Sequence, residues 1–155
     1  MKKTKILSLA LALFFILTFS AFAQADGFLQ LIDAKGDAQM RIAKGSWIPV
    51  KAGTVLSERD SLRTKKGGWI TLVVFEDKEK QIGTVELKEN SYLRLKELPQ
   101  KNKPDRGVLL DLVLGEVLVK AKPLVSKAPF EVKTPTSFVR VDGQASFSVQ
   151  VEKLD

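Results

Sequence analysis

The sequence contains no cysteine and no histidine. Without cysteine the fold cannot depend on disulfide bonds, and the two commonest kinds of zinc ligand are missing. The same absences remove the thiol nucleophile and the imidazole general base that many enzymes use. The chain also lacks the sequence patterns of a nucleophile elbow, a dinucleotide-binding turn and a P-loop. We therefore expect no metal, no cofactor and no catalytic residue.

Long hydrophobic runs are nearly absent as well. The run Leu9–Leu17 follows three lysines and precedes Ala21-Phe22-Ala23, a small-x-small cleavage pattern. This layout predicts a secretory signal peptide over residues 1–23 and a mature chain that begins at Gln24. A membrane anchor is the alternative, but a spanning helix needs about 20 apolar residues. We expect an exported protein, periplasmic or extracellular, with no stable membrane anchor in its mature form.

The charge balance is only moderately basic. The formal net charge is +7, and removing the three lysines of the predicted signal peptide (Lys2, Lys3 and Lys5) leaves +4. An excess of this size permits attraction to anionic polymers or membrane surfaces but does not demand it. Because there is no arginine-rich block and no basic helix, we expect no nucleic-acid partner.

Short segments rich in valine, isoleucine, threonine and phenylalanine recur between glycines and prolines. Such residues favour strands, and the regular turn signals are typical of an all-β sandwich or barrel. We expect a single compact domain over residues 24–155, built of many short, mostly antiparallel strands as a sandwich or roll. The candidate strands span residues 28–32, 37–43, 61–64, 69–75, 84–88, 92–98, 108–114, 116–121, 130–132, 137–141 and 145–151.

Two interruptions divide the alternating segment near the C-terminus. Apolar residues occupy even positions before Thr134-Pro135 and odd positions after it, from Val139 to Val151. Since strand side chains alternate with a period of two, this frame change moves the buried face. We expect the proline to mark a corner or bulge where the chain changes face or sheet. The parity does not change at Asp142-Gly143, which favours a three-residue loop or one long strand bent at Gly143.

A second change of parity occurs at Leu114-Gly115-Glu116-Val117. The apolar positions are even up to Leu114 and odd from Val117 onwards. A two-residue hairpin loop produces such a change, and a type II′ turn requires glycine at its first loop position. The sequence therefore predicts a hairpin with Gly115 in its turn.

Few residues indicate binding. The Lys65-Lys66-Gly67-Gly68 turn could hold a phosphate or carboxylate, although a soluble hairpin tip is the simpler interpretation. Trp47 either contacts a ligand or packs in the core, whereas we expect Trp69 in the core. Arg106 belongs to the polar segment Pro99–Gly107, which we expect to protrude. The candidate binding residues are Trp47, Lys65, Lys66 and Arg106.

Two groups of residues resemble the FecR-type domain family. The first runs from a glycine through a Trp-x-Pro and a Gly-x-x-Leu to an Asp-x-Leu-Arg-Thr, and comprises Gly36, Trp47, Pro49, Gly53, Leu56, Asp60, Leu62, Arg63 and Thr64. The second comprises Phe130, Val132, Thr134, Pro135, Val139, Val141, Gly143 and Phe147. Together with Gly115, these residues are interpreted as framework: glycines at turns, prolines at corners, and Asp60 as the cap of a turn.

The chain departs from the family pattern in two ways. Where the family has Arg-Gly-Thr-x-Phe, this chain has Asp142-Gly143-Gln144-Ala145-Ser146-Phe147. FecR regulators resemble transmembrane anti-sigma relays with a cytoplasmic segment, whereas only five residues precede the apolar region here. The resemblance therefore implies a stand-alone exported version of the sensing domain.

The leading hypothesis is a non-catalytic exported binding module that engages an envelope protein or a cell-wall or surface polymer. One alternative is a carbohydrate-active enzyme that uses two carboxylates, with Asp60 and Asp77 as the candidate pair. Another is a purely structural component of the cell envelope.

Overall fold

The computed structural model describes residues 26–153, which form twelve strands and no helix, and hence no helix in this range that could span a membrane. The strands are β1 (Phe28–Lys35), β2 (Ala38–Arg41), β3 (Ile48–Pro49), β4 (Val55–Leu56), β5 (Ser61–Thr64), β6 (Trp69–Phe75), β7 (Gln81–Leu87), β8 (Tyr92–Glu97), β9 (Val108–Ala121), β10 (Phe130–Lys133), β11 (Phe138–Val141) and β12 (Ala145–Val151). The predicted signal peptide, 1–23, and the predicted first mature residue, Gln24, lie outside the described residues.

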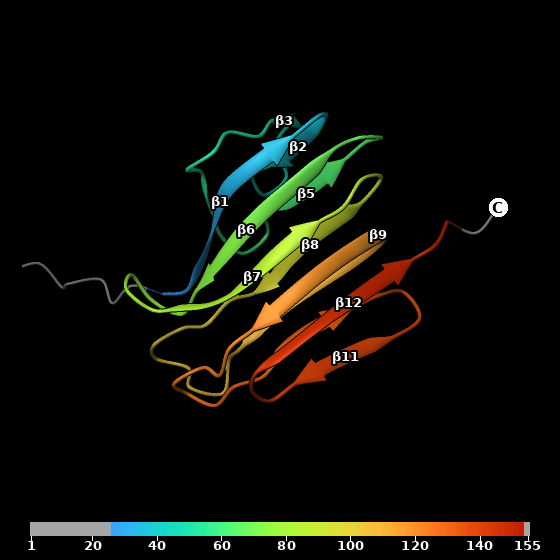
Figure 1. Cartoon of the computed structure of the whole chain (residues 1–155). Coiled ribbons are helices and arrows are strands. Elements are labelled where there is room, and N and C mark those ends of the chain that lie inside the picture. The colour runs from blue at the N-terminus through green and yellow to red at the C-terminus, as the bar shows by residue number, and fades with distance from the viewer. Residues whose placement is uncertain (1–25, 154–155) are drawn as a thin grey trace, which may run out of the picture.

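The strands form two layers that share the long strand β9 (Figure 1). Sheet A has the order β12-β9-β7-β6-β1-β4. Sheet B has the order β3-β2-β5-β8-β9-β10-β11. All these pairings are antiparallel except β10 with β9, which is parallel. The prediction of an all-β domain of mostly antiparallel strands is confirmed, and the layers make it a sandwich closed on one side by β9.

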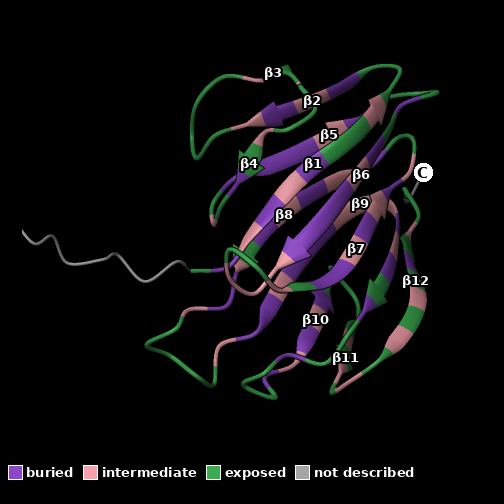
Figure 2. Ribbon diagram, turned by 60° about the vertical axis from the view of Figure 1, so that its left-hand side comes forward, coloured by how far each residue is buried: buried purple, intermediate pink, exposed green. Residues whose placement is uncertain are grey.

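The core lies between the two sheets and follows from the alternation of the strands. Figure 2 shows the buried residues in purple along the central strands of both layers. Burying apolar surface is the main favourable term in folding, about 25 cal/mol per Å². The fully buried side chains include Leu29, Leu31, Leu72, Val74, Val85 and Val119 from sheet A, and Leu62, Leu93, Leu95, Leu110, Leu112, Phe130 and Val132 from sheet B.

The predicted hairpin at Gly115 is wrong. Residues 108–121 form one strand, which pairs with β8 and β10 before Gly115 and with β7 and β12 after it. The register shift between Tyr92 and Leu93 places an extra residue of β9 in the ladder, which explains the change of parity. Gly115 has a φ of 90° and bends the strand where it passes from sheet B to sheet A.

The predicted corner at Thr134-Pro135 is also wrong in part. The two residues begin the loop of an ordinary hairpin, because β10 and β11 pair in register from Phe130 with Val141 to Lys133 with Phe138, within sheet B. This pairing joins even to odd positions, so a hairpin suffices to explain the change of parity. The Thr134 hydroxyl accepts the Ser137 N–H at 2.8 Å and holds the loop closed.

The passage between the sheets occurs instead at Asp142-Gly143-Gln144. These three residues separate β11, which pairs in sheet B, from β12, which pairs in sheet A. Of the two alternatives for this segment, a three-residue loop or one long strand bent at Gly143, the structure has the loop. Figure 2 shows β12 alternating between exposed and intermediate residues, with Phe147 and Val151 half-buried against the core and Val149 buried.

Candidate functional site

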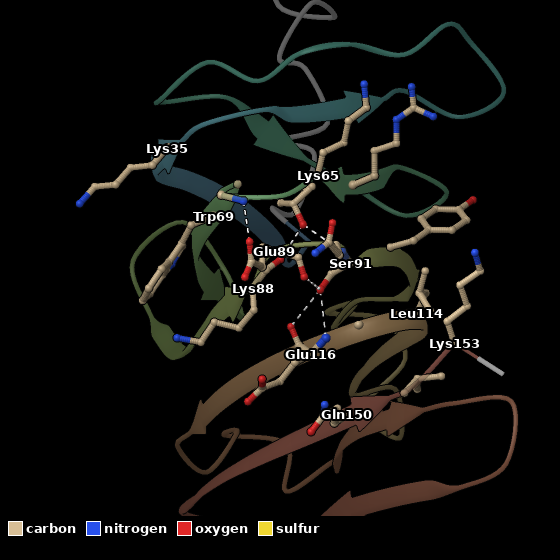
Figure 3. Close-up of a pocket in the computed structure, with 18 of the residues that line it drawn as sticks. Lys35, Lys65, Trp69, Lys88, Glu89, Ser91, Leu114, Glu116, Gln150 and Lys153 are labelled. Atoms are coloured by element: carbon tan, nitrogen blue, oxygen red, sulfur yellow. Dashed lines mark hydrogen bonds between the residues drawn. The ribbon is translucent and has the colours of Figure 1, made fainter. Parts of the chain in front are cut away.

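A groove of about 1160 Å³ lies at one end of the sandwich. It is built from the β5–β6 turn, the β7–β8 turn, the bend of β9 and the end of β12, which lie together at the right-hand end of Figure 1. Figure 3 shows the groove with Trp69 and Lys88 on one side and Leu114 and Lys153 on the other. Segments far apart in the sequence therefore contribute to a single concave surface.

The floor of the groove is fixed by hydrogen bonds around Ser91. Its Oγ donates to the Glu89 carbonyl at 3.0 Å and accepts the Glu116 N–H at 3.0 Å. Its N–H donates to Thr64 Oγ1 at 3.1 Å, and that hydroxyl donates to the Lys88 carbonyl at 2.5 Å. Ser91 and Thr64 are both buried. Because every one of these polar groups has a partner, the turns that carry the groove side chains are held in one arrangement.

One wall is a cluster of aromatic rings and guanidinium groups on the outer face of sheet B. The Trp47 ring centroid lies 4.2 Å from the Arg63 guanidinium carbon and 4.8 Å from that of Arg41. Its ring also meets Tyr92 edge-on at 5.7 Å, and Arg41 Nη2 donates to the Tyr92 hydroxyl at 3.1 Å. Trp47 therefore lies outside the core and is only partly exposed to solvent. Its ring contacts two arginine side chains at the groove.

The opposite wall carries Trp69, and here the prediction of a core tryptophan is wrong. The residue is 36% exposed, and Lys88 Nζ lies over the ring, 3.7 Å from its centroid. The alternation of β6 explains this position, because Ile70, Leu72 and Val74 point inwards and the odd positions therefore point outwards. The parity of WITLVVF is the sequence signal that would have placed Trp69 on the surface.

The charge of the groove is strongly unbalanced. Six cationic side chains line it (Lys35, Arg41, Arg63, Lys65, Lys88 and Lys153) against two carboxylates, Glu89 and Glu116. Lys65 pairs with Asp37 at 3.1 Å and Lys88 with Glu86 at 3.8 Å. Within residues 26–153, Lys35, Arg41 and Arg63 form no ion pair. One of the two carboxylates, Glu89, accepts a hydrogen bond from the Gly67 N–H at 2.6 Å.

The four predicted binding residues do not form one site. Trp47 and Lys65 line the groove, whereas Lys66 is exposed on the same turn without lining it. Arg106 borders a separate cavity of about 250 Å³, and its Nη2 lies 2.8 Å from Glu58 Oε1. Arg106 thus ties its loop to the turn between β4 and β5. Sequence reasoning did not select Lys35, Arg41 or Lys88 and interpreted Arg63 as framework, because only pairing of the strands brings these four residues together.

The two carboxylates considered for catalysis each serve a different turn. Asp60 is only 3% exposed, and its oxygens accept the N–H groups of Ala43 at 3.0 Å and Ser57 at 2.9 Å. Asp77 Oδ1 accepts two backbone N–H groups, from Glu79 and Lys80, each at 2.8 Å. The bond from the Glu79 N–H, followed by that from Lys80, lowers the pKa of Asp77 below its ordinary value of 3.8. Asp60 therefore has the capping role that we expected of a framework residue. Both carboxylates are hydrogen-bonded to backbone N–H groups of different turns, which does not support the hypothesis of a catalytic pair.

The other framework residues occupy turns and edges. Gly53 has a φ of 88°, and its N–H donates to the Leu31 carbonyl at 2.7 Å. Pro49 ends the edge strand β3, where a missing N–H leaves the ladder intact. No group of three or more metal-binding side chains occurs among the described residues.

A family model described as FecR protein matches residues 60–155. The chain therefore belongs to the FecR family, as the sequence motifs indicated. The matched range includes Asp60, Arg63 and the C-terminal Thr-Pro segment, whereas Trp47 and Pro49 precede it. Neither the curated proteins nor the solved structures contain a match.

Proposed function

We propose that this FecR-family chain is a non-catalytic, exported binding module that engages a component of the cell envelope, either a protein or a cell-wall or surface polymer. The observation that carries the proposal is the groove at one end of the sandwich, which gathers six cationic side chains and three aromatic rings on a hydrogen-bonded floor. Concave sites with a few convergent polar groups are the usual places for ligands. The signal-peptide pattern of residues 1–23 supports export.

The test is recovery of a partner from an envelope extract with the immobilised mature chain. The groove variant combines Lys35→Gln with Trp69→Ala, which removes one unpaired cation and one exposed ring. A matched control combines Lys66→Gln with Phe138→Ala, an exposed lysine and an exposed aromatic residue that do not line the groove. Eluates are analysed for both proteins and sugars over a range of salt concentrations.

A component recovered by the wild type and the control but lost by the groove variant supports the proposal. Equal recovery by all three chains contradicts a role for the groove and favours a purely structural component. Recovery of abundant background proteins alone, at every salt concentration, contradicts the binding module itself.

A further inference from the structure

We infer that the groove takes an acidic polysaccharide, a chain of sugar rings that carries carboxylate, phosphate or sulfate groups. This inference rests on the proposed binding function and names the chemistry of its ligand. Four features of the described residues carry it: the unpaired cations, the placement of the aromatic rings, the size of the groove, and the paired backbone of the turns that line it.

The cations select for negative charge. Lys35, Arg41 and Arg63 lie in the groove and form no ion pair within the described part of the chain. Arg41 and Arg63 are bonded only to neutral groups, since Arg41 donates to the Tyr92 hydroxyl and Arg63 Nε donates to Gln39 Oε1 at 2.7 Å. Both guanidinium groups are therefore held in place without being neutralised. Oriented arginines of this kind suit carboxylate and phosphate oxygens.

The aromatic rings favour a ligand that has flat apolar faces as well as negative charges. A pyranose ring presents a face of C–H groups that stacks on indole. Trp69 offers a partly exposed indole, and the Lys88 ammonium lies over one face of it, 3.7 Å from the ring centroid. An indole with a cation over one face suits a sugar that stacks on the remaining exposed part of the ring and carries an acidic group near the cation. On the other side, Tyr92 pairs with Leu114 across β8 and β9 and contacts Trp47. Figure 3 shows Trp69 and Leu114 on opposite sides of the groove.

The size of the groove favours an extended ligand. Its volume of about 1160 Å³ exceeds the range of about 300–1,000 Å³ that is usual for pockets of small molecules. Aromatic rings on opposite sides, Trp69 on one and the Trp47–Tyr92 pair on the other, with cations along the groove, match a polymer with several repeating units better than one free anion.

An acidic peptide is disfavoured because the backbone of the turns around the groove is already paired. The Lys65 N–H donates to the Asp37 carbonyl at 3.0 Å, Thr64 to Ser91 at 2.9 Å, and Lys88 to Glu116 at 3.0 Å. Peptides in extended conformation commonly bind by adding a strand to an open edge. The turns offer no such edge, and the edge strand β12 reaches the groove only with its last residues, Gln150 and Val151. At the turns, a ligand must therefore be bound by side chains. Asn90 and Gln150 are exposed there, and their amide groups suit the hydroxyl groups of a sugar.

The experiment compares polymers that differ in one property. Isothermal titration of the mature chain uses oligogalacturonate, which carries a carboxylate on each ring, against its fully methyl-esterified form, which has the same backbone without charge. Dextran sulfate against dextran repeats the comparison with a sulfated polymer, and a phosphomannan against mannan with a phosphorylated one. Poly-L-glutamate and single-stranded oligothymidylate test whether negative charge alone is enough.

The expected result is binding of at least one charged glycan that is at least about tenfold tighter than binding of its neutral counterpart and that weakens with salt. Trp69→Ala should weaken it about three- to tenfold and Lys35→Gln by a similar factor, while Lys66→Gln and Phe138→Ala leave it unchanged. Circular dichroism and thermal melting confirm that each variant is folded.

Three results overturn the inference. They are equal affinity for charged and neutral glycans, equal or tighter affinity for polyglutamate or oligothymidylate, and insensitivity of glycan binding to Trp69→Ala. If glycans fail to bind but the groove variant still loses a protein partner from the envelope extract, the inference fails and the proposed function stands. If no component depends on the groove in either experiment, both fail.

Discussion

The Arg63 guanidinium carbon lies 4.2 Å from the centre of the Trp47 ring, although sixteen positions separate the two residues in the sequence. The contact joins the segment before β3 to strand β5 across β2, whose Gln39 accepts a hydrogen bond from Arg63 Nε. Two pieces of the family pattern thus meet on the outer face of sheet B, where they form one wall of the groove.

This contact predicts a measurable coupling. In a double-mutant cycle with Trp47→Ala and Arg63→Ala, we expect a coupling free energy of about 0.5–2 kcal/mol, because a cation over an indole face is attracted to it. Urea unfolding of the four chains measures it. Arg63→Lys keeps the charge but loses the planar group, so it should retain only part of the coupling. Strict additivity of the two single substitutions would show that the contact contributes nothing to stability.

Gly115→Ala should be among the most damaging single-methyl changes in this chain. Gly115 has a φ of 90°, and a Cβ there would overlap Ser91, including its backbone Cα. The matched control is Gly53→Ala, at a φ of 88° with open space around the added methyl. We expect Gly53→Ala to cost about 1 kcal/mol from backbone strain and Gly115→Ala at least about 2 kcal/mol more, because Ser91 must move. Equal losses in urea melts would mean that the bend of β9 adapts without cost.

Phe147→Ala should destabilise the fold by about 2 kcal/mol. Fully buried phenylalanines cost about 3–5 kcal/mol when truncated to alanine, but Phe147 lies on the edge strand β12 and is only half-buried. The neighbouring Ser148 points to solvent, so Ser148→Ala should change stability by less than about 0.5 kcal/mol. A larger loss from Ser148→Ala than from Phe147→Ala would reverse the assigned faces of β12.

The hydrogen bonds of Asp77 should make the free energy of unfolding depend on pH. Its folded pKa is lowered, chiefly by the N–H groups of Glu79 and Lys80. A lowered folded pKa contributes stability that is fully present above the ordinary value of 3.8 and is lost as the pH falls through the folded pKa. The melting temperature of Asp77→Asn should therefore lie below that of the wild type near neutral pH, and the two should converge in acid. A difference that grows as the pH falls would contradict this assignment.

Export predicts the mass of the mature protein. The protein recovered from the producing cell should begin at Gln24 and remain in solution without detergent, because cleavage after Ala23 removes the apolar run. Intact-mass measurement of the purified protein tests this. A chain that retains Met1 and fractionates with membranes would identify the run as an anchor.

Much of the fold was predictable from the local pattern of the sequence. Strict alternation in residues 145–151 predicted both the strand and its inward face, because a strand that covers a core must place apolar side chains at every second position. The capping role of Asp60 and the need for glycine at Gly53 likewise follow from the chemistry of turns. The alternation, the Ser57–Asp60 bond and the positive φ of Gly53 depend on neighbours within a few residues, whereas the bond from the Ala43 N–H to Asp60 needs the tertiary structure.

Strand partners were decided by the tertiary structure. The parity change at Gly115 is produced equally by a hairpin and by a bulge, and only the pairing of β9 with both sheets distinguishes them. The groove has the same origin. The side chains that line it include Lys35, Arg63 and Lys88, which are far apart in the sequence. Hydrogen-bonded pairing between distant strands brings them to one end of the sandwich. Local sequence determines which face a residue takes, whereas the packing of distant strands determines which residues share that face.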